Sequence, residues 1–257
     1  RLAFVFSGQG AQWLGMGRSL LRQEPVFREV VSRCDQVIRE LAGFSVLAEL
    51  EAEEQHSRLD RQDVVQPLLF SLQVALAALW RSFGVEPDAV LGHSMGEVAA
   101  ACVAGALSLE TAALIVCTRS RLAQRVRGLG SMLLVELTKG EAEQLIVGQE
   151  AALSVAACNG PRSTVLSGDI AAVERAAELL RQRGVFHRRI QVEYASHSPQ
   201  MDLLREDLCT ALREVRPEAA KVYMRSTGST EVVLGPELTA AYWAENLRRP
   251  VLFAQAA

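Results

Sequence analysis

A serine held between two glycines follows an apolar run in this chain, and this arrangement limits the folds that the chain can adopt. Residues 88–92 have the composition of a buried strand, and Gly92-His93-Ser94-Met95-Gly96 follows it directly. Residues 98–106 are small or apolar on all sides, which predicts a helix buried against the sheet. A strand, a G-x-S-x-G turn and a helix form the pattern called a nucleophile elbow, which predicts an α/β fold with a mostly parallel sheet, like that of the α/β-hydrolases.

This turn suits a nucleophile for reasons of geometry. It exposes the Ser94 Oγ beyond the sheet, at a helix N-terminus where free N–H groups favour developing negative charge. The backbone N–H of Met95 is then one predicted oxyanion donor. The alternative is that a glycine-rich turn holds a serine with no chemical role.

Size and charge narrow the classes of function. A chain of 257 residues with 49% hydrophobic residues can form one large domain, or a domain with an insertion. The net charge of −3 gives no basic surface for nucleic acid or anionic lipid. We find no signal peptide and no apolar run of membrane-spanning length, and the five scattered cysteines favour a reducing, cytoplasmic setting. The chain begins in a strand pattern and ends in a helical one, so we expect a piece of a longer protein.

The middle of the chain has the pattern of a separate small unit. Its predicted elements follow the order β-α-β-β-α-β, which is the ferredoxin-like arrangement. We therefore expect a large α/β-hydrolase-like subdomain formed by residues 1–130 and 192–257, and a small inserted ferredoxin-like subdomain formed by residues 131–191. The small unit carries no evident catalytic group, so we expect it to wall one side of a cleft. In the large subdomain, Gln66-Pro67 is predicted to open a helix, with Pro67 at its first position.

A serine nucleophile needs a base, and the chain has four histidines. His56 lies in a polar stretch, and His187 precedes two arginines at the edge of the small unit. His93 neighbours Ser94, but adjacent strand residues point to opposite faces. His197 remains, in a loop of small polar residues where the chain returns to the large subdomain, and it is the predicted general base. No acidic residue is evident to orient it.

A second candidate is Arg119, which falls within the apolar arc of a predicted helix. A buried guanidinium needs a partner. One interpretation is an internal salt bridge. The other is a binding site for the carboxylate of a ligand, a role that the planar guanidinium fills better than lysine.

Several motifs in register resemble the acyltransferase domains of modular type I polyketide synthases, within the malonyl-CoA:acyl carrier protein transacylase superfamily. They are Gly8-Gln9-Gly10-Ala11-Gln12-Trp13, Gln66-Pro67, Gly92-His93-Ser94-Met95-Gly96-Glu97, Arg119, Tyr194-Ala195-Ser196-His197-Ser198 and Asn246-Leu247-Arg248-Arg249-Pro250. The resemblance covers essentially the whole chain.

The resemblance implies a role for each matching residue. Ser94 carries the acyl group, His197 activates it, and the backbone N–H groups of Gln9 and Met95 form the oxyanion hole. A backbone carbonyl orients the histidine, and the matching position is Asn246. The resemblance also implies that Arg119 binds the substrate carboxylate, and that Gln66 and His93 line the pocket.

The same resemblance bears on the choice of acyl group. Tyr194, Ala195 and Ser196 match the pattern of methylmalonyl-selecting domains, whereas malonyl-selecting ones carry His-Ala-Phe-His there. Met95 is commoner among malonyl-selecting domains, and Ser7 replaces a usual proline. One methyl group is worth only about 1 to 3 kcal/mol in a pocket, so a malonyl-selective or permissive enzyme is the alternative.

The expected activity is therefore transfer of an extender unit, methylmalonyl before malonyl, from CoA to Ser94 and on to the phosphopantetheine thiol of an acyl carrier protein. The resemblance implies no metal and no bound cofactor. It implies acyl-CoA, the carrier protein and neighbouring ketosynthase or linker domains as partners, and neither nucleic acid nor membrane. A serine esterase or thioesterase and an inactive scaffold module remain alternatives.

Overall fold

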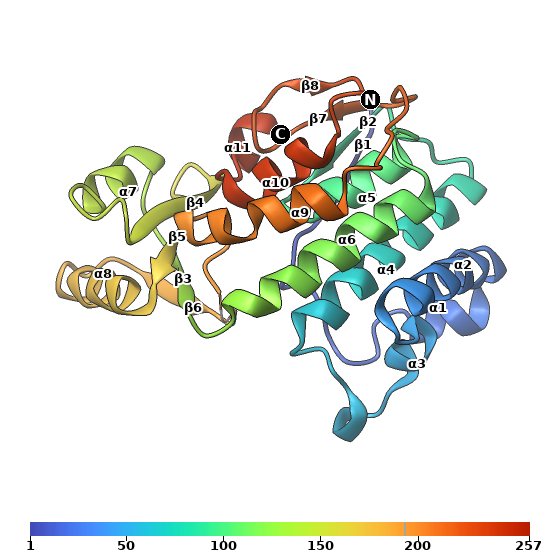
Figure 1. Cartoon of the computed structure of the whole chain (residues 1–257), viewed down its shortest axis with the longest axis horizontal. Helices are drawn as coiled ribbons and strands as arrows, with labels where there is room; N and C mark the ends of the chain where they lie inside the picture. The colour runs from blue at the N-terminus through green and yellow to red at the C-terminus, as the bar shows by residue number, and fades with distance from the viewer. Residues whose placement is uncertain (193) are drawn as a thin grey trace.

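The computed structural model describes residues 1–192 and 194–257, and it builds them around two sheets. The large subdomain holds the sheet β1-β2-β7-β8, and the small subdomain holds the sheet β4-β5-β3-β6 (Figure 1). The strands are β1 (Ala3–Phe6), β2 (Ala89–Gly92), β3 (Gly130–Val135), β4 (Leu153–Gly160), β5 (Ser163–Asp169), β6 (His187–Ile190), β7 (Tyr223–Arg225) and β8 (Val232–Val233). The α-helices are α1 (Arg18–Gln23), α2 (Pro25–Ala42), α3 (Val46–Glu51), α4 (Gln62–Ser82), α5 (Gly96–Val103), α6 (Leu109–Ala123), α7 (Lys139–Leu145), α8 (Ile170–Gln182), α9 (Arg205–Ala211), α10 (Ala240–Arg248) and α11 (Phe253–Ala256).

The sheet of the large subdomain is parallel where it carries the elbow. Strand β2 pairs in parallel with β1 on one side, with Phe6 opposite Gly92, and with β7 on the other, with Val90 opposite Met224. Within this sheet, only the short β8 pairs antiparallel with its neighbour among the described strands. The predicted α/β architecture with a mostly parallel sheet is confirmed.

Helix α5 leads away from the elbow through the centre of the core. Val98, Ala99, Ala100 and Ala101 are all completely buried, because α5 packs between the sheet and the longer helices α4 and α6. Small side chains let these neighbours approach the α5 backbone closely. The elbow therefore leads into a helix that is buried along almost its whole length.

Helix α4 begins earlier than the sequence predicts. It starts at Gln62, so Pro67 lies within the helix and is not its first residue. The first turn forms because the Arg61 carbonyl accepts hydrogen bonds from the N–H groups of Val64 and Val65. Proline costs the helix one further hydrogen bond, and the packing of α4 against α2 and α6 outweighs that loss.

The same helix corrects a second expectation. By length and composition, α4 could cross a membrane, although no such run was expected from the sequence. However, 67% of its most apolar window is buried inside the protein. Packing in a protein core accounts for this composition.

The small subdomain has the strand order of a ferredoxin-like unit. Strands β4, β5, β3 and β6 are neighbours in that order, and every pair is antiparallel. Helices α7 and α8 pack on one face, around Leu133, Leu153 and Leu166. The other face meets the end of the chain, where Val251 pairs with Ala157 of β4.

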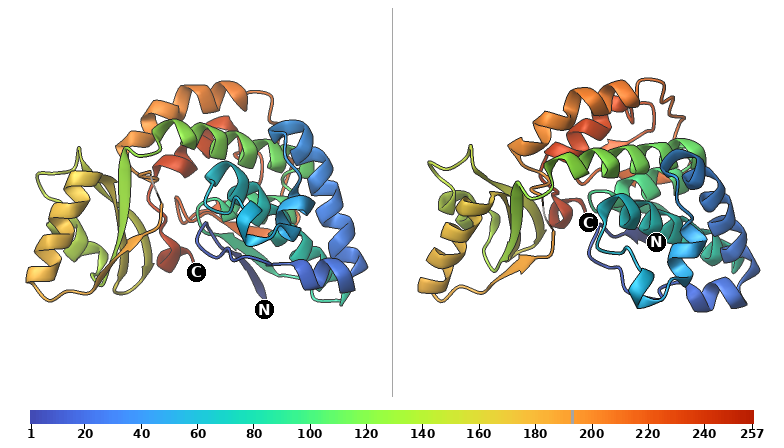
Figure 2. Two further views of the ribbon diagram at one scale, coloured as in Figure 1. Left: turned by 90° about the horizontal axis from the view of Figure 1, so that it is seen from below. Right: turned by 60° about the horizontal axis from the view of Figure 1, so that its bottom comes forward.

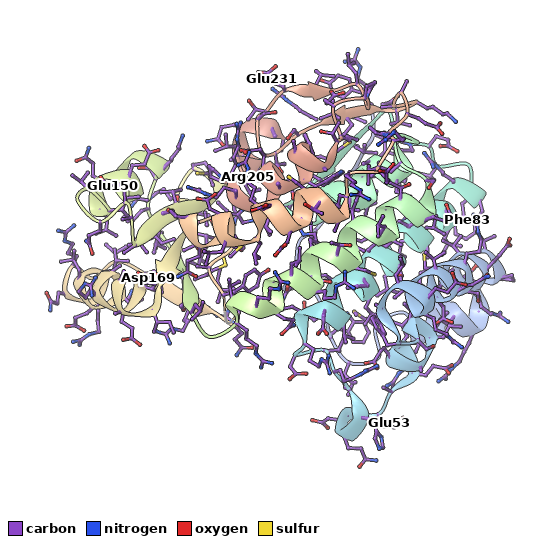
Figure 3. All side chains as sticks on the ribbon, in the orientation of Figure 1. Glu53, Phe83, Glu150, Asp169, Arg205 and Glu231 are labelled. Carbon is purple, nitrogen blue, oxygen red and sulfur yellow. The ribbon has the colours of Figure 1, made fainter. Side chains whose placement is uncertain are left out.

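The two subdomains lie side by side, with the C-terminus between them in the view from below (Figure 2). Helices α6 and α9 run next to each other in the large subdomain. The chain passes to the small subdomain after α6 and returns before α9, so both connections lie at the same end of this helix pair (Figures 1 and 2). Charged side chains project outward from both parts, as the labelled Glu53, Glu150 and Glu231 illustrate (Figure 3).

Candidate active site

The elbow holds Ser94 in a backbone conformation that few residues adopt. Ser94 has a φ of 54° and lies between the end of β2 and the start of α5. A Cβ at Gly92 would lie 2.1 Å from the Glu97 nitrogen, and a Cβ at Gly96 would lie 2.2 Å from the Phe6 oxygen. Both positions therefore require glycine, and together they keep the turn tight enough to present the Ser94 Oγ.

His197 is the histidine that meets the serine. Its Nε2 lies 2.8 Å from the Ser94 Oγ, as the elimination among the four histidines predicts. Its Nδ1 lies 2.6 Å from the backbone carbonyl oxygen of Arg249. Because a carbonyl can only accept, Nδ1 carries the proton, and Nε2 is free to accept the hydroxyl proton of Ser94.

The carbonyl that orients His197 belongs to Arg249, so the prediction of Asn246 is wrong. Asn246 lies within α10, which ends at Arg248. Arg249 follows the helix in an extended conformation, with a ψ of 153°, because it precedes Pro250. Its carbonyl therefore turns out of the helix and toward the imidazole. The proline was the signal in the sequence that could have located this carbonyl.

Burial keeps the imidazole of His197 neutral. Removal from water, and to a smaller extent the nearby Arg119 guanidinium, lower the pKa of His197 to about 3. The hydrogen bond from Nδ1 to the Arg249 carbonyl opposes this shift. In the free protein at neutral pH, His197 is thus available as a base.

Arg119 is buried without an acidic partner among the described residues. It is 3% exposed, and its Nη1 donates to the side-chain Oδ1 of Asn246 at 2.7 Å. Its Nε is buried and has no partner in the described chain. Burial lowers the pKa of Arg119, while Tyr194 and Glu97 oppose the shift. The internal salt bridge considered from the sequence is absent from the described residues, which leaves most of the guanidinium free to bind an anion.

Gln66 joins the glycine loop to the loop that carries His197. Its Nε2 lies 3.2 Å from the Gln9 Oε1 and 3.3 Å from the Tyr194 hydroxyl. Its own Oε1 is buried without a partner in the described chain. Gln66 is therefore both a support for the site and a free acceptor within it.

The predicted oxyanion donors lie next to this support. Met95 is the N-cap of α5, and Gln9 lies in the turn after β1. Neither backbone N–H is hydrogen-bonded within the part of the chain that the structure describes. Their role stays a prediction.

His93 serves the junction between the subdomains. Its Nε2 lies 2.8 Å from the Oδ1 of Asn159, at the end of β4. Burial lowers its pKa, so the ring is neutral and Nε2 donates to the amide oxygen. Asn159 was missed from the sequence, because nothing local indicates that its turn meets the elbow.

The three residues before His197 lie under cover. Tyr194 is 5% exposed, Ala195 is completely buried, and Ser196 is 8% exposed. The Ser196 hydroxyl donates to the sulfur of Met132, on β3, at 3.3 Å. Met132 thus brings the small subdomain into contact with the predicted specificity positions, and no local pattern around either residue indicates this contact.

Comparison with known proteins decides the family. The family described as "Acyl transferase domain" matches residues 3–257. The chain belongs to the acyltransferase domains of modular polyketide synthases.

Relatives of this acyltransferase domain are much longer than it is. It is 46% identical over 255 residues to a spectinabilin polyketide synthase system protein of Streptomyces orinoci, covering 99% of this chain and 7% of that protein. It is equally similar to the erythronolide synthase EryA2 of Saccharopolyspora erythraea, with the same coverage. These relatives are multidomain synthases, of which the chain spans a small fraction.

Solved structures agree with the fold. The acyltransferase domain from module 8 of the salinomycin polyketide synthase is 41% identical and superimposes with a TM-score of 0.96, over 100% of this chain and 60% of that one. A malonyl CoA-acyl carrier protein transacylase from Coxiella burnetii is 29% identical, with a TM-score of 0.90, over 99% of this chain and 81% of that one.

Proposed function

We propose that this acyltransferase domain transfers an extender acyl group, methylmalonyl in preference to malonyl, from CoA to Ser94 and then to the phosphopantetheine thiol of an acyl carrier protein. The observation that carries the proposal is the 2.8 Å contact between Ser94 and His197, beside a buried Arg119 that lacks an acidic partner in the described chain. The reaction uses side chains and backbone groups of this chain and needs no metal or bound cofactor.

In the first half-reaction, the Ser94 Oγ attacks the thioester carbon as its proton passes to the His197 Nε2. The negative charge that forms on the carbonyl oxygen is stabilised by the N–H groups of Met95 and Gln9, at the N-terminal end of α5. The tetrahedral intermediate collapses with cleavage of the C–S bond. The proton on Nε2 leaves with the CoA thiol, and the acyl group stays on Ser94 as an ester.

In the second half-reaction, the thiol of the carrier protein takes the place of CoA. His197 accepts its proton as the sulfur attacks the ester carbon. Collapse of the second intermediate breaks the bond to the Ser94 Oγ, which receives the proton from Nε2. The products are an acyl thioester on the carrier and a free hydroxyl, so the cycle is a ping-pong reaction.

The proposed role of Arg119 is to bind the free carboxylate of the extender unit. An ion pair and hydrogen bonds to a desolvated guanidinium fix the acyl group with its thioester carbon over Ser94. A hydrolase of neutral esters gains nothing from such a cation, which argues against the esterase or thioesterase alternative. An intact set of Ser94, His197 and Arg119 also argues against an inactive scaffold.

The proposed preference for methylmalonyl depends on residue 196. Serine there leaves room for the α-methyl group, whereas phenylalanine would crowd it. We weight this position above Met95, because a clash with a bulky wall costs more than an unfilled space. We further propose that the domain works in the cytoplasm, beside ketosynthase and linker domains of a longer synthase.

Intact-mass spectrometry after incubation with equal methylmalonyl-CoA and malonyl-CoA tests the proposal. We expect an adduct on Ser94, mostly methylmalonyl, and none in Ser94→Ala. A predominant malonyl adduct would refute the preference, and the lack of any acyl adduct would refute the function. In Arg119→Ala, we expect methylmalonyl loading to fall at least about tenfold, the loss of a charged hydrogen bond, while propionyl loading is spared. Equal loss with both acyl groups would refute the carboxylate site.

A further inference from the structure

Glu97 is a completely buried acid three residues after Ser94 in the chain. Its Oε1 accepts hydrogen bonds from the Thr227 N–H at 2.5 Å and the Thr227 hydroxyl at 2.8 Å. Its Oε2 accepts from the Tyr242 hydroxyl at 2.5 Å and from the Asn246 Nδ2 at 3.1 Å. Glu97 forms no ion pair within the described residues, so donors from two segments, the loop after β7 and helix α10, hold it in place as an acceptor.

Asn246 connects this acid to the site. Its Nδ2 faces two acceptors, Oε2 of Glu97 at 3.1 Å and the backbone oxygen of Ser94 at 3.3 Å. Its Oδ1 faces the Nη1 of Arg119 at 2.7 Å. A flipped amide would put oxygen against two acceptors and NH₂ against a cation, so Glu97 and Ser94 fix which way the amide points.

This arrangement orients Arg119 without neutralising it. A guanidinium has five N–H donors, and the amide oxygen of Asn246 engages one nitrogen, Nη1. The remaining donors include the buried Nε, which has no partner in the described chain. An acid at position 246 would form an ion pair with Arg119 and compete with a substrate carboxylate. An amide held by a more distant acid avoids that competition.

We infer that Glu97 is a positioning residue: acting through the side chain of Asn246, it sets the orientation of Arg119 and so favours acyl groups that carry a free carboxylate. This inference rests on the proposed function and deepens it. Glu97 also ties α5 to the segment after β7, because the Thr227 N–H donates to Glu97 and the single proton of the Thr227 hydroxyl lies within reach of both Glu97 and the Gly92 carbonyl. A purely structural role would impair every acyl substrate alike, and this difference makes the inference testable.

The test compares kcat/KM for acyl loading from methylmalonyl-CoA and from propionyl-CoA, which lacks the carboxylate. In Glu97→Gln, an amide NH₂ must face one of the donors, so the orientation of Asn246 is weakened. We expect the methylmalonyl to propionyl ratio to fall about tenfold, mainly through a higher KM for methylmalonyl-CoA, as for a weakened charged hydrogen bond. Asn246→Ala should lower the ratio similarly.

A double variant tests whether Glu97 acts through Asn246 or whether the two residues act independently. If Glu97 acts through Asn246, Glu97→Gln combined with Asn246→Ala should lower the ratio no further than Asn246→Ala alone. Glu49→Gln is the matched control. Glu49 is also a buried acid, 7% exposed, but it lies on α3, outside the site, and pairs with Arg58. We expect its ratio to equal that of the wild type.

Three outcomes would overturn the inference. One is equal loss with both acyl groups in Glu97→Gln, and another is a multiplicative loss in the double variant. If Glu97→Gln does not fold, an unchanged ratio in Asn246→Ala would overturn it. Failure of the proposed function is recognised separately, since then the wild type loads neither acyl group, or Arg119→Ala leaves the ratio unchanged.

Discussion

Ser94 and His197 lie 2.8 Å apart, but they reach this geometry by different routes. Ser94 is placed by two glycines close to it in sequence. Gly92 and Gly96 have no side chain, so the turn can pack directly against the Glu97 and Phe6 backbones. His197 is placed by distant residues: its N–H donates to the Leu247 carbonyl, and its Nδ1 donates to the Arg249 carbonyl. Both residues have a positive φ, 54° and 59°, but only the first lies between glycines that a sequence pattern can reveal.

Ser94 and His197 should therefore be sensitive to different substitutions. The elbow depends on the absence of side-chain atoms at Gly92 and Gly96, so one methyl group added at either position should disrupt it. The base depends on the backbone carbonyls of Leu247 and Arg249, so a change of the exposed Arg249 side chain should be tolerated while the chain path persists. The four predictions that follow test this difference, beginning with the largest effect.

Gly96→Ala should abolish acyl loading and strongly destabilise the fold. The new Cβ would lie 2.2 Å from the Phe6 oxygen, and overpacking of this kind costs about 3 kcal/mol or more. Thermal unfolding and loading assays measure both effects. Gly140→Ala is the matched control, because nothing lies within 4 Å of its Cβ and its helix should gain slightly. A stable, active Gly96→Ala would show that the elbow is not locked by contact.

Ser196→Phe should shift the choice of acyl group on the His197 side of the site. The larger ring would displace the contact with Met132 and crowd an α-methyl group. We expect the methylmalonyl to malonyl ratio to fall about 10- to 200-fold, the range for one methyl group in a pocket. Competition between the two thioesters, read by mass spectrometry, gives the ratio directly. A ratio equal to that of the wild type would rule out residue 196 as a determinant.

The pH dependence of acyl loading should show that His197 stays neutral. Because burial and Arg119 lower the pKa of His197 to about 3, kcat/KM for loading should be nearly constant between pH 7 and pH 5. With a histidine of ordinary pKa, kcat/KM would fall about 25-fold over that range. The free energy of unfolding should fall as the pH drops below about 6.5, because the unfolded chain then binds the proton that the folded one excludes. A rate profile with a midpoint near 6.5 would contradict the shift.

Arg249→Ala should have the smallest effect. The site uses the backbone carbonyl of this residue, while its side chain is 57% exposed and pairs with Glu245 on the surface. Exposed pairs contribute about 0 to 1 kcal/mol, so kcat should change less than about threefold. Steady-state loading rates check this. A loss of a hundredfold would mean that the side chain, and not the carbonyl, orients His197.

The fold was largely predictable, since its determinants repeat along the chain. The elbow, the order of elements in the small unit and the pairing of Ser94 with His197 all follow from local patterns or from elimination among few candidates. The start of α4 did not follow, because tertiary packing tolerates Pro67 inside a helix. The details around the site were missed because they depend on contacts between distant parts of the chain. Asn159 contacts His93, Met132 contacts Ser196 and Glu97 contacts Asn246, and these pairs are separated by 66, 64 and 149 positions in the sequence.

Local sequence is enough to locate the nucleophile, because the close contacts at Gly92 and Gly96 leave no space for a side chain on either side of the turn. It also determined that Arg119 is buried, through its place in an apolar helical arc. The folded chain was needed to show that Arg249 supplies the carbonyl for His197, and that the Asn246 side chain faces Arg119 instead. A backbone oxygen has no residue signature, and the direction of an amide is set by whichever donors and acceptors surround it in the folded chain.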